Sequence, residues 1–327
     1  MAKAIKLPSG NWRVQAHSHG QTKSFTATTK RGAEMAALEW QSQRKEDFSA
    51  DKTLAAAAEE YIAQRKNIIS PVTLQTYKGY IRRYLKDLQC IPISEITQKS
   101  LQMSYNELAG KLSAKTLKSV YGFYNSVFKA NGIEFSITLP KIYKKSYNTP
   151  NKEMGAKILE CAKGSNVELP VNLALKCGLR ISEISGLKWS AVHDNYIIID
   201  NVLVAFGAGT YEKKPKSSAG NRKIPITPEI KALIDKQPKT SEYVVPLNPN
   251  AIRARFNKLL QKNDLPHIKF HELRHAFASN MALLGIPEAY AKSIGGWDTG
   301  AVLHGIYEQI FFEQEKEFIE KVQNFYK

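Results

Sequence analysis

The pentapeptide HELRH at residues 271–275 combines residue types that suit two different chemistries. If His271, Glu272 and His275 act together, the H-E-x-x-H spacing is that of zinc proteases, in which two imidazoles one helical turn apart bind the metal and the glutamate is a general base. If His271 acts with Arg274 instead, the stretch supplies two side chains suited to binding a phosphate group. The first alternative needs a third metal ligand, and the second needs further cations.

The residues that follow the pentapeptide give the zinc site little support. The longer metzincin pattern would have glycine at position 278 and histidine at 281, where the chain has Ala278 and Met281. Glu288 could be a third ligand, but it follows a proline and no helical pattern aligns it with the histidines. Arg274 would also hold a fixed positive charge close to the metal. We therefore expect no metal and no other cofactor.

A second arginine strengthens the phosphate alternative. Arg180 lies between two apolar stretches, residues 173–179 and 181–187, so its guanidinium is not expected to be a solvated surface charge. A buried guanidinium needs an anion. If Arg180 and Arg274 both donated to the non-bridging oxygens of one phosphodiester, they would stabilise the added charge of a pentacoordinate transition state.

Cleavage of such a phosphodiester also needs a nucleophile and an acid for the leaving group. Tyr307 offers a phenol whose free pKa of about 10 would be lowered by neighbouring cations, although it is one of 15 tyrosines. The stretch KKPKSSAGNRKIPI at residues 213–226 predicts a lysine-rich β-hairpin that could protonate a leaving oxygen. Its candidate acids are Lys213, Lys214, Lys216 and Lys223.

The charge of the whole chain indicates the class of partner. The 327 residues include 47 Lys and Arg against 30 Asp and Glu, a net charge of +17 that favours a polyanionic partner. Residues 52–149 hold fifteen of the basic residues and six of the acidic ones, and their helical spacing predicts basic helix faces. The candidate DNA contacts are Arg13, Lys23, Lys78, Arg82, Arg83, Lys115 and Lys118.

The elements that must position these groups divide the chain into four segments, mainly α-helical with small β parts. Residues 1–50 predict two short strands, with a turn at residues 19–20, against one helix. Residues 51–138 predict a four-helix bundle with an aromatic core, and the proline- and lysine-containing stretch 139–150 predicts a linker. Residues 151–327 predict a mixed α+β domain. Its β-rich stretches are residues 195–206, 222–226 and 243–247.

Cysteine usage and hydropathy indicate the compartment. Cys90, Cys161 and Cys177 are odd in number and have no metal-binding spacing, which favours a reducing environment. No apolar run approaches the ~18 residues of a membrane span, and the first residues lack the apolar stretch of a signal peptide. We expect a soluble, cytoplasmic protein.

Four of these segments together resemble the tyrosine recombinases, the family of the phage integrases. Its first arginine lies in a GLRxSEIxxLxW box, here GLRISEISGLKW, and its lysine precedes an R-x-I-P-L strand, here RKIPI. Its second box is HxLRH, here HELRH, and its tyrosine follows an LGH segment, here GGW. This sequence departs from the family pattern at Trp297, where most members have histidine. An indole can donate one hydrogen bond but cannot transfer a proton.

The resemblance implies a role for each matched residue. The residues that would touch the phosphate or the reacting oxygens are the phosphate-binding Arg180 and Arg274, the ligand and proton-transfer group His271, the hydrogen-bond donor Trp297, the general acid Lys216 and the nucleophile Tyr307. Glu183 has the supporting acidic position of the first box. We expect His275 to pack or to orient a neighbour, and His304 to lie on a helix face.

The resemblance also implies an activity and an assembly. The enzyme would cleave and rejoin double-stranded DNA attachment sites through a 3'-phosphotyrosine, without metal or ATP, to integrate or excise a phage or mobile element. A SAM-like core-binding bundle and the catalytic domain would clamp the core site, and residues 1–50 would bind arm sites. We expect a homotetramer in a bacterial cytoplasm, associated with the nucleoid when bound to DNA, with the tail at 311–327 docked on a neighbour. An excisionase and a DNA-bending host factor are possible partners.

Other functional classes remain open on these residues. A chromosome-dimer-resolving recombinase would share the boxes, and a type IB topoisomerase would form the same covalent intermediate but act as a monomer. A DNA-binding protein without catalysis would need only the charge. A zinc hydrolase would lose its activity to chelators.

Overall fold

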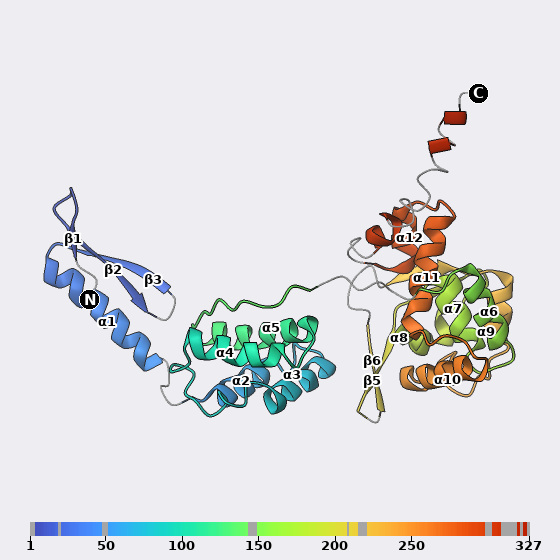
Figure 1. Ribbon diagram of the computed structural model, residues 1–327, viewed down its shortest axis with the longest axis horizontal. Helices are drawn as coiled ribbons and strands as arrows, with labels where there is room; N and C mark the ends of the chain where they lie inside the picture. Colours follow the sequence, from blue (N-terminus) through green and yellow to red (C-terminus); the bar gives the residue numbers. More distant parts are fainter. Residues whose placement is uncertain are drawn as a thin grey trace. The chain divides into compact units, whose positions relative to one another are not determined.

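The computed structural model describes residues 4–18, 21–47, 52–142, 149–207, 209–214, 221–297, 303–308, 319–320 and 323–325. The chain divides into two compact units, Met1–Lys144 and Lys145–Lys327 (Figure 1). The turn expected at residues 19–20, the expected acid Lys216 and most of the C-terminal tail lie outside the described residues. Among the described residues, no helix has both the length and the apolar character that a membrane span requires.

The N-terminal segment is an antiparallel sheet packed on one helix. The elements are β1 (Ile5–Lys6), β2 (Trp12–Ser18), β3 (Gln21–Ala27) and α1 (Lys30–Asp47), with strand order β1-β2-β3. The short β1 adds to the two strands that the sequence predicts. Val14 and Ala16, alternate residues of β2, are buried in one cluster with Ala33 and Ala37 of α1. The alternate residues of the strand and one face of the helix therefore pack together in one small core.

The next segment contains the four helices that the sequence predicts. They are α2 (Leu54–Ala63), α3 (Pro71–Arg83), α4 (Gln98–Ala109) and α5 (Ala114–Ala130). Each begins after a serine or threonine whose side-chain oxygen accepts a hydrogen bond from the backbone N–H three residues later. These caps are Thr53, Ser70, Thr97 and Ser113. The predicted aromatic core is confirmed, since Phe123, Tyr124 and Phe128 are buried and other tyrosines pack against them.

The chain that leaves α5 runs along α4 before the linker begins. The side-chain amide of Gln98 both donates to the carbonyl of Ser136 and accepts from its N–H. One turn later, Gln102 bonds to Thr138 in the same way, at 3.1 and 2.9 Å. The two side-chain amides thus donate and accept as the peptide groups of a neighbouring strand would. They hold the backbone up to residue 138 against the bundle.

The second unit is built mainly of helices. They are α6 (Lys152–Ala162), α7 (Glu168–Cys177), α8 (Ile181–Gly186), α9 (Pro228–Asp235), α10 (Pro249–Lys262), α11 (Phe270–Leu283) and α12 (Glu288–Gly295), with a 3-10 turn at Trp189–Ala191. Helix α7 is apolar and buried almost all round, and α11 packs along it (Figure 1). The central position of α7 explains why the stretch before Arg180 has no polar face.

The strands of this unit form two separate pairs, which corrects two predictions. β4 (Tyr196–Ile199) pairs with β7 (Arg222–Pro225), and β5 (Val202–Phe206) pairs with β6 (Gly209–Lys213). In the described residues β6 and β7 pair with other strands and not with each other, so the strands that flank the lysine-rich stretch do not form the expected hairpin. Residues 215–220 of this stretch lie outside the described part of the chain. The expected strand at residues 243–247 is also wrong: in the described structure only Tyr243 forms a bridge, with Lys188.

Candidate active site

Arg180 follows a tight turn between α7 and α8. Helix α7 ends at Gly178, whose φ of 68° is in the left-handed region, and a Cβ at this position would lie 2.5 Å from the ring of Phe277. Glycine is therefore required by both conformation and space. The Arg180 side chain is 35% exposed. The guanidinium is therefore partly buried, as expected for a group that is not merely a solvated surface charge, and one side of it is open to solvent.

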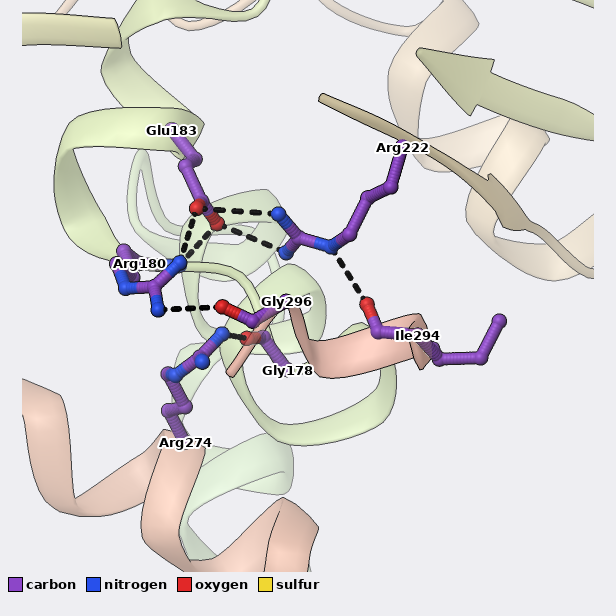
Figure 2. Close-up of polar contacts among 7 residues, drawn as sticks. All are labelled: Gly178, Arg180, Glu183, Arg222, Arg274, Ile294 and Gly296. Atoms are coloured by element: carbon purple, nitrogen blue, oxygen red, sulfur yellow. Dashed lines mark hydrogen bonds and ion pairs between the residues drawn. The ribbon is translucent and has the colours of Figure 1, made fainter. Parts of the chain in front are cut away.

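The carboxylate of Glu183 lies between two arginines (Figure 2). From Arg180 it accepts the backbone N–H at 2.8 Å and Nη1–H at 2.7 Å. From Arg222 it accepts Nη1–H at 3.2 Å and Nη2–H at 3.0 Å. Burial raises the pKa of Glu183, but the charge and hydrogen bonds of Arg222 and the charges of Arg180 and Arg274 outweigh it and hold this pKa below its usual value. Glu183 is therefore an anion that supports both guanidiniums.

Arg222 is a site residue for which the sequence interpretation gave no role. It is 8% exposed, and its Nε–H donates to the carbonyl of Ile294 at 2.6 Å. A signal was present in the motif RKIPI, because Arg222 shares the inward face of β7 with the buried Ile224. A charged residue at an inward strand position is rare unless it is paired.

Arg274 is a buried cation with incomplete hydrogen bonding. It is 2% exposed, and its guanidinium carbon lies 4.0 Å from the ring centroid of Trp297. Nη1 donates to the carbonyl of Gly178, whereas Nη2 has no hydrogen-bond partner in the described part of the chain. Burial, aided by the charge of Arg180, lowers the pKa of Arg274 to about 9. A buried guanidinium with a spare donor is suited to an anionic ligand.

The two histidines of the pentapeptide lie on successive turns of α11. The His271 side chain reaches the surface while His275 is buried, and their rings meet edge to face with centroids 4.9 Å apart. Desolvation lowers the pKa of both, and the positive charge of Arg274 lowers it further. His271 is therefore neutral near pH 7 and can accept a proton.

The glutamates of the zinc interpretation have other contacts. Glu272 accepts the backbone N–H of Lys269 at 2.8 Å, which caps the start of α11. Glu288 begins α12, so the expectation that no helix supports it was wrong. Its carboxylate lies 3.2 Å from Nδ1 of His304, whose Nε2 lies 3.2 Å from Glu308. The predicted position of His304 on an exposed helix face is confirmed.

Trp297 is positioned by the two glycines that precede it. A Cβ on Gly295 would lie 1.7 Å from the indole, and Gly296 has a φ of 66°. The carbonyl of Gly296 accepts Nη2–H of Arg180 at 2.7 Å. The indole is 8% exposed and stacks on Phe277, with ring centroids 6.5 Å apart. The turn therefore joins Arg180 to the aromatic support of Arg274.

Tyr307 lies in the same hydrophobic cluster as Trp297 and Phe277. It is 2% exposed, and its hydroxyl donates to the carbonyl of Ile286 at 2.9 Å. Burial and the charge of Glu288 raise the pKa of Tyr307. The expectation that neighbouring cations lower this pKa was wrong, because the phenol is buried, donates to a carbonyl and lies within the field of the Glu288 carboxylate.

The seven basic residues expected to contact DNA are all exposed. On the N-terminal sheet, Arg13 and Lys23 project from opposite faces, because Lys23 pairs with the buried Ala16 and Arg13 alternates with it. They therefore do not form one contact surface. The other five lie on α3 and α5. They are Lys78, Arg82, Arg83, Lys115 and Lys118.

Comparisons with known proteins identify both parts of the chain. Residues 142–314 match the sequence profile of the phage integrase family, and residues 53–109 match the phage integrase N-terminal SAM-like domain. The XerC-like tyrosine recombinase of Caldanaerobacter subterraneus subsp. tengcongensis is 24% identical over 78% of each chain. The transposase from transposon Tn916 of Enterococcus faecalis is 27% identical over 46% of this chain and 45% of its own.

Solved structures share the fold. The Tn1549 transposon integrase in complex with circular intermediate DNA has a TM-score of 0.70 at 19% identity, covering 83% of this chain and 99% of its own. The lambda integrase tetramer bound to a Holliday junction has a TM-score of 0.62 at 18% identity, covering 93% of this chain and 94% of its own. The mainly helical, multidomain architecture predicted from the sequence is confirmed by these similarities.

Proposed function

The chain belongs to the phage integrase family, and we propose that this site-specific DNA recombinase cleaves DNA with Tyr307 while Arg180 and Arg274 hold the scissile phosphate. The observation that carries the proposal is the buried guanidinium of Arg274, whose hydrogen bonding is incomplete. It is 2% exposed, yet Nη2 has no partner in the described structure. Such a group costs folding free energy unless an anion completes its hydrogen bonds.

The arrangement of the two arginines supports a shared phosphate. Arg180 is held from behind by Glu183 and by the carbonyl of Gly296, while its side chain remains 35% exposed. Arg274 is fixed by Gly178 and by the indole of Trp297. Because both guanidiniums are oriented before DNA binds, little reorganisation is needed to stabilise the charge of the transition state.

The reaction follows from these groups. The phenol oxygen of Tyr307 attacks phosphorus and its proton passes to the neutral imidazole of His271. The bond from phosphorus to the 5'-oxygen breaks, and the ammonium of Lys216 protonates that oxygen, which leaves a 3'-phosphotyrosine and a 5'-hydroxyl. Attack by a 5'-hydroxyl of a partner duplex reverses the step. The covalent bond conserves the energy of the broken linkage, so the reaction needs no ATP.

Tyr307 must change its hydrogen bond before it can react. In this structure its hydroxyl donates to the carbonyl of Ile286 and its pKa is raised by burial. Attack on phosphorus requires that this bond break and that the phenol move to the arginines. We infer that DNA binding favours this movement, because the phosphate completes the hydrogen bonds of Arg274.

The relatives support a mobile-element substrate and an oligomeric complex. Several are transposon proteins, and one solved neighbour is a tetramer on a Holliday junction. We propose that this chain recombines double-stranded attachment sites of a phage or mobile element as a homotetramer. The exposed basic residues of α3 and α5 would contact core DNA, and residues 1–50 would contact arm sites. We place the reaction in a bacterial cytoplasm, with an excisionase and a DNA-bending factor as accessory partners.

A covalent-adduct assay tests the function. Tyr307→Phe protein is used to select binding sites from a random duplex library, and the selected duplex is then nicked near the cleavage position so that the product cannot religate. Wild-type protein should accumulate a denaturation-resistant adduct in EDTA, and Tyr307→Phe should form none. Absence of the adduct with the wild type, or its persistence with Tyr307→Phe, would contradict the proposed function.

A further inference from the structure

Arg222 is a buried arginine of the active site, and each of its three side-chain nitrogens donates a hydrogen bond. Its Nε–H donates to the carbonyl of Ile294 at 2.6 Å, and both Nη atoms donate to Glu183 (Figure 2). Its side chain is 6% exposed, whereas that of Arg180 is 35% exposed. Of these two guanidiniums, only that of Arg180 can reach a ligand from solvent.

Both oxygens of Glu183 are shared between the two arginines. Oε1 accepts from Arg180 at 2.7 Å and from Arg222 at 3.2 Å, and Oε2 accepts from the backbone of Arg180 at 2.8 Å and from Arg222 at 3.0 Å. The carboxylate is therefore fixed from two sides. A planar guanidinium that binds both oxygens sets the orientation of the carboxyl plane, which in turn sets the direction of the Arg180 guanidinium.

The shared carboxylate also determines the charge of the site. Glu183 contributes one negative charge, whereas Arg180, Arg222 and Arg274 each contribute a positive one. If Arg222 were absent, the hydrogen bonds to the buried carboxylate would come from Arg180 alone, and more of the Arg180 charge would be used to neutralise Glu183. With Arg222 present, the carboxylate is neutralised from behind, and the charge of Arg180 remains available.

We propose that Arg222 is a positioning residue of the recombination reaction that acts through Glu183 on Arg180. The Ile294 carbonyl fixes the guanidinium so that both of its Nη atoms face the carboxylate. This inference rests on the proposed function. A purely structural role would predict a loss of stability with Arg222 variants, but no dependence of their cleavage rate on whether Arg180 is present.

The test compares Arg222→Met in two backgrounds of the full chain, wild type and Arg180→Ala. At saturating protein on the nicked duplex, and at a temperature where each variant is folded, Arg222→Met should slow adduct formation about 100-fold in the wild type. It should slow it less than about threefold in Arg180→Ala. DNA affinity, measured in the Tyr307→Phe background, should change less than about threefold because Arg222 is buried. Arg253→Met is the matched control, because Arg253 is exposed on α10 and, in the described part of the chain, donates a side-chain hydrogen bond to the nearby Asn250.

Two outcomes would overturn the proposal: an unchanged rate in the wild-type background, or an equal loss in both backgrounds. If Arg222→Met does not fold, Arg222→Lys keeps the charge and gives the same comparison, with an expected loss of about tenfold. A second measurement does not depend on cleavage. Hydrogen exchange at Nη1–H of Arg180, which donates to Glu183, should accelerate in Arg222→Lys when followed by NMR. An unchanged rate would refute the positioning role even if the wild type formed no adduct.

Discussion

Replacement of Arg274 by methionine should stabilise the DNA-free protein while it abolishes cleavage. The guanidinium is 2% exposed, and its pKa is lowered from the usual value of an arginine to about 9. At about 1.36 kcal/mol per pKa unit, that shift corresponds to a cost of about 5 kcal/mol for the buried charge. The cost is fully present below pH 9, because the folded-state pKa is the lower one. The apolar packing of the arginine stem offsets part of this cost, and the methionine side chain would keep most of that packing.

The net gain is smaller than the cost of the charge. Exchange of a buried ionic group for an apolar one of similar volume typically changes stability by about 1–4 kcal/mol in its favour. A gain of about 2 kcal/mol in the free energy of unfolding would raise the melting temperature of a unit of this size by about 4–8 °C. The neighbouring Arg222 gives the opposite control. Its guanidinium is paired with the buried Glu183, so Arg222→Met should cost about 3 kcal/mol.

Differential scanning calorimetry of the full chain at pH 7 gives the melting temperature of both variants. It is read from the transition in which the unit that contains the active site unfolds. DNA carrying the selected site should then raise the melting temperature of the wild type more than that of Arg274→Met, because only the wild type can bond the phosphate at this position. If Arg274→Met melts several degrees below the wild type without DNA, the guanidinium is stabilising in the free protein. The inference of an unsatisfied buried cation would then be wrong.

Two further predictions concern the backbone and the histidines. Gly178→Ala should lower the free energy of unfolding by about 3 kcal/mol, because the new Cβ would meet Phe277 and the backbone is in a left-handed conformation. Gly285 has the same conformation but open space around it, so Gly285→Ala should cost about 1 kcal/mol. Thermal denaturation measures both. In NMR titrations His271 should titrate below 6.5 and His304 above it. Stability contributed by neutral His271 should be lost as the pH falls below 6.5, whereas that of protonated His304 should be lost as the pH rises through its raised pKa. Reversed titrations, or equal costs for the two glycines, would refute these assignments.

The helices of the bundle could be predicted because their boundaries are encoded locally. Thr53, Ser70, Thr97 and Ser113 each cap a helix through a backbone N–H only three residues away. The stretch at 243–247 has the composition of a strand, but its formation depended on a partner elsewhere in the chain, and of it only Tyr243 forms a bridge. Strand pairing of this kind is not visible in a single sequence.

The candidate site was predictable as a set of residues but not as a set of contacts. The boxes select Arg180, Arg274 and Tyr307 as candidates, whereas the stacking of Trp297 under Arg274 depends on the packing of α12 against α11. The pKa of Tyr307 was predicted with the wrong sign because the identity of its nearest neighbours, Ile286 and Glu288, is a tertiary property. Motif spacing indicates which groups are candidates for one site, but their contacts and burial determine their protonation.

The measurement that tests the mechanism most directly is identification of the residue and the DNA end that become linked. The adduct formed on the nicked duplex is digested with protease and nuclease, and the nucleotide-bearing peptide is sequenced by mass spectrometry. The mechanism predicts a single modified peptide in which Tyr307 carries the 3'-phosphate of the cleaved strand. Linkage to another of the 15 tyrosines, or to a 5'-phosphate, would contradict it.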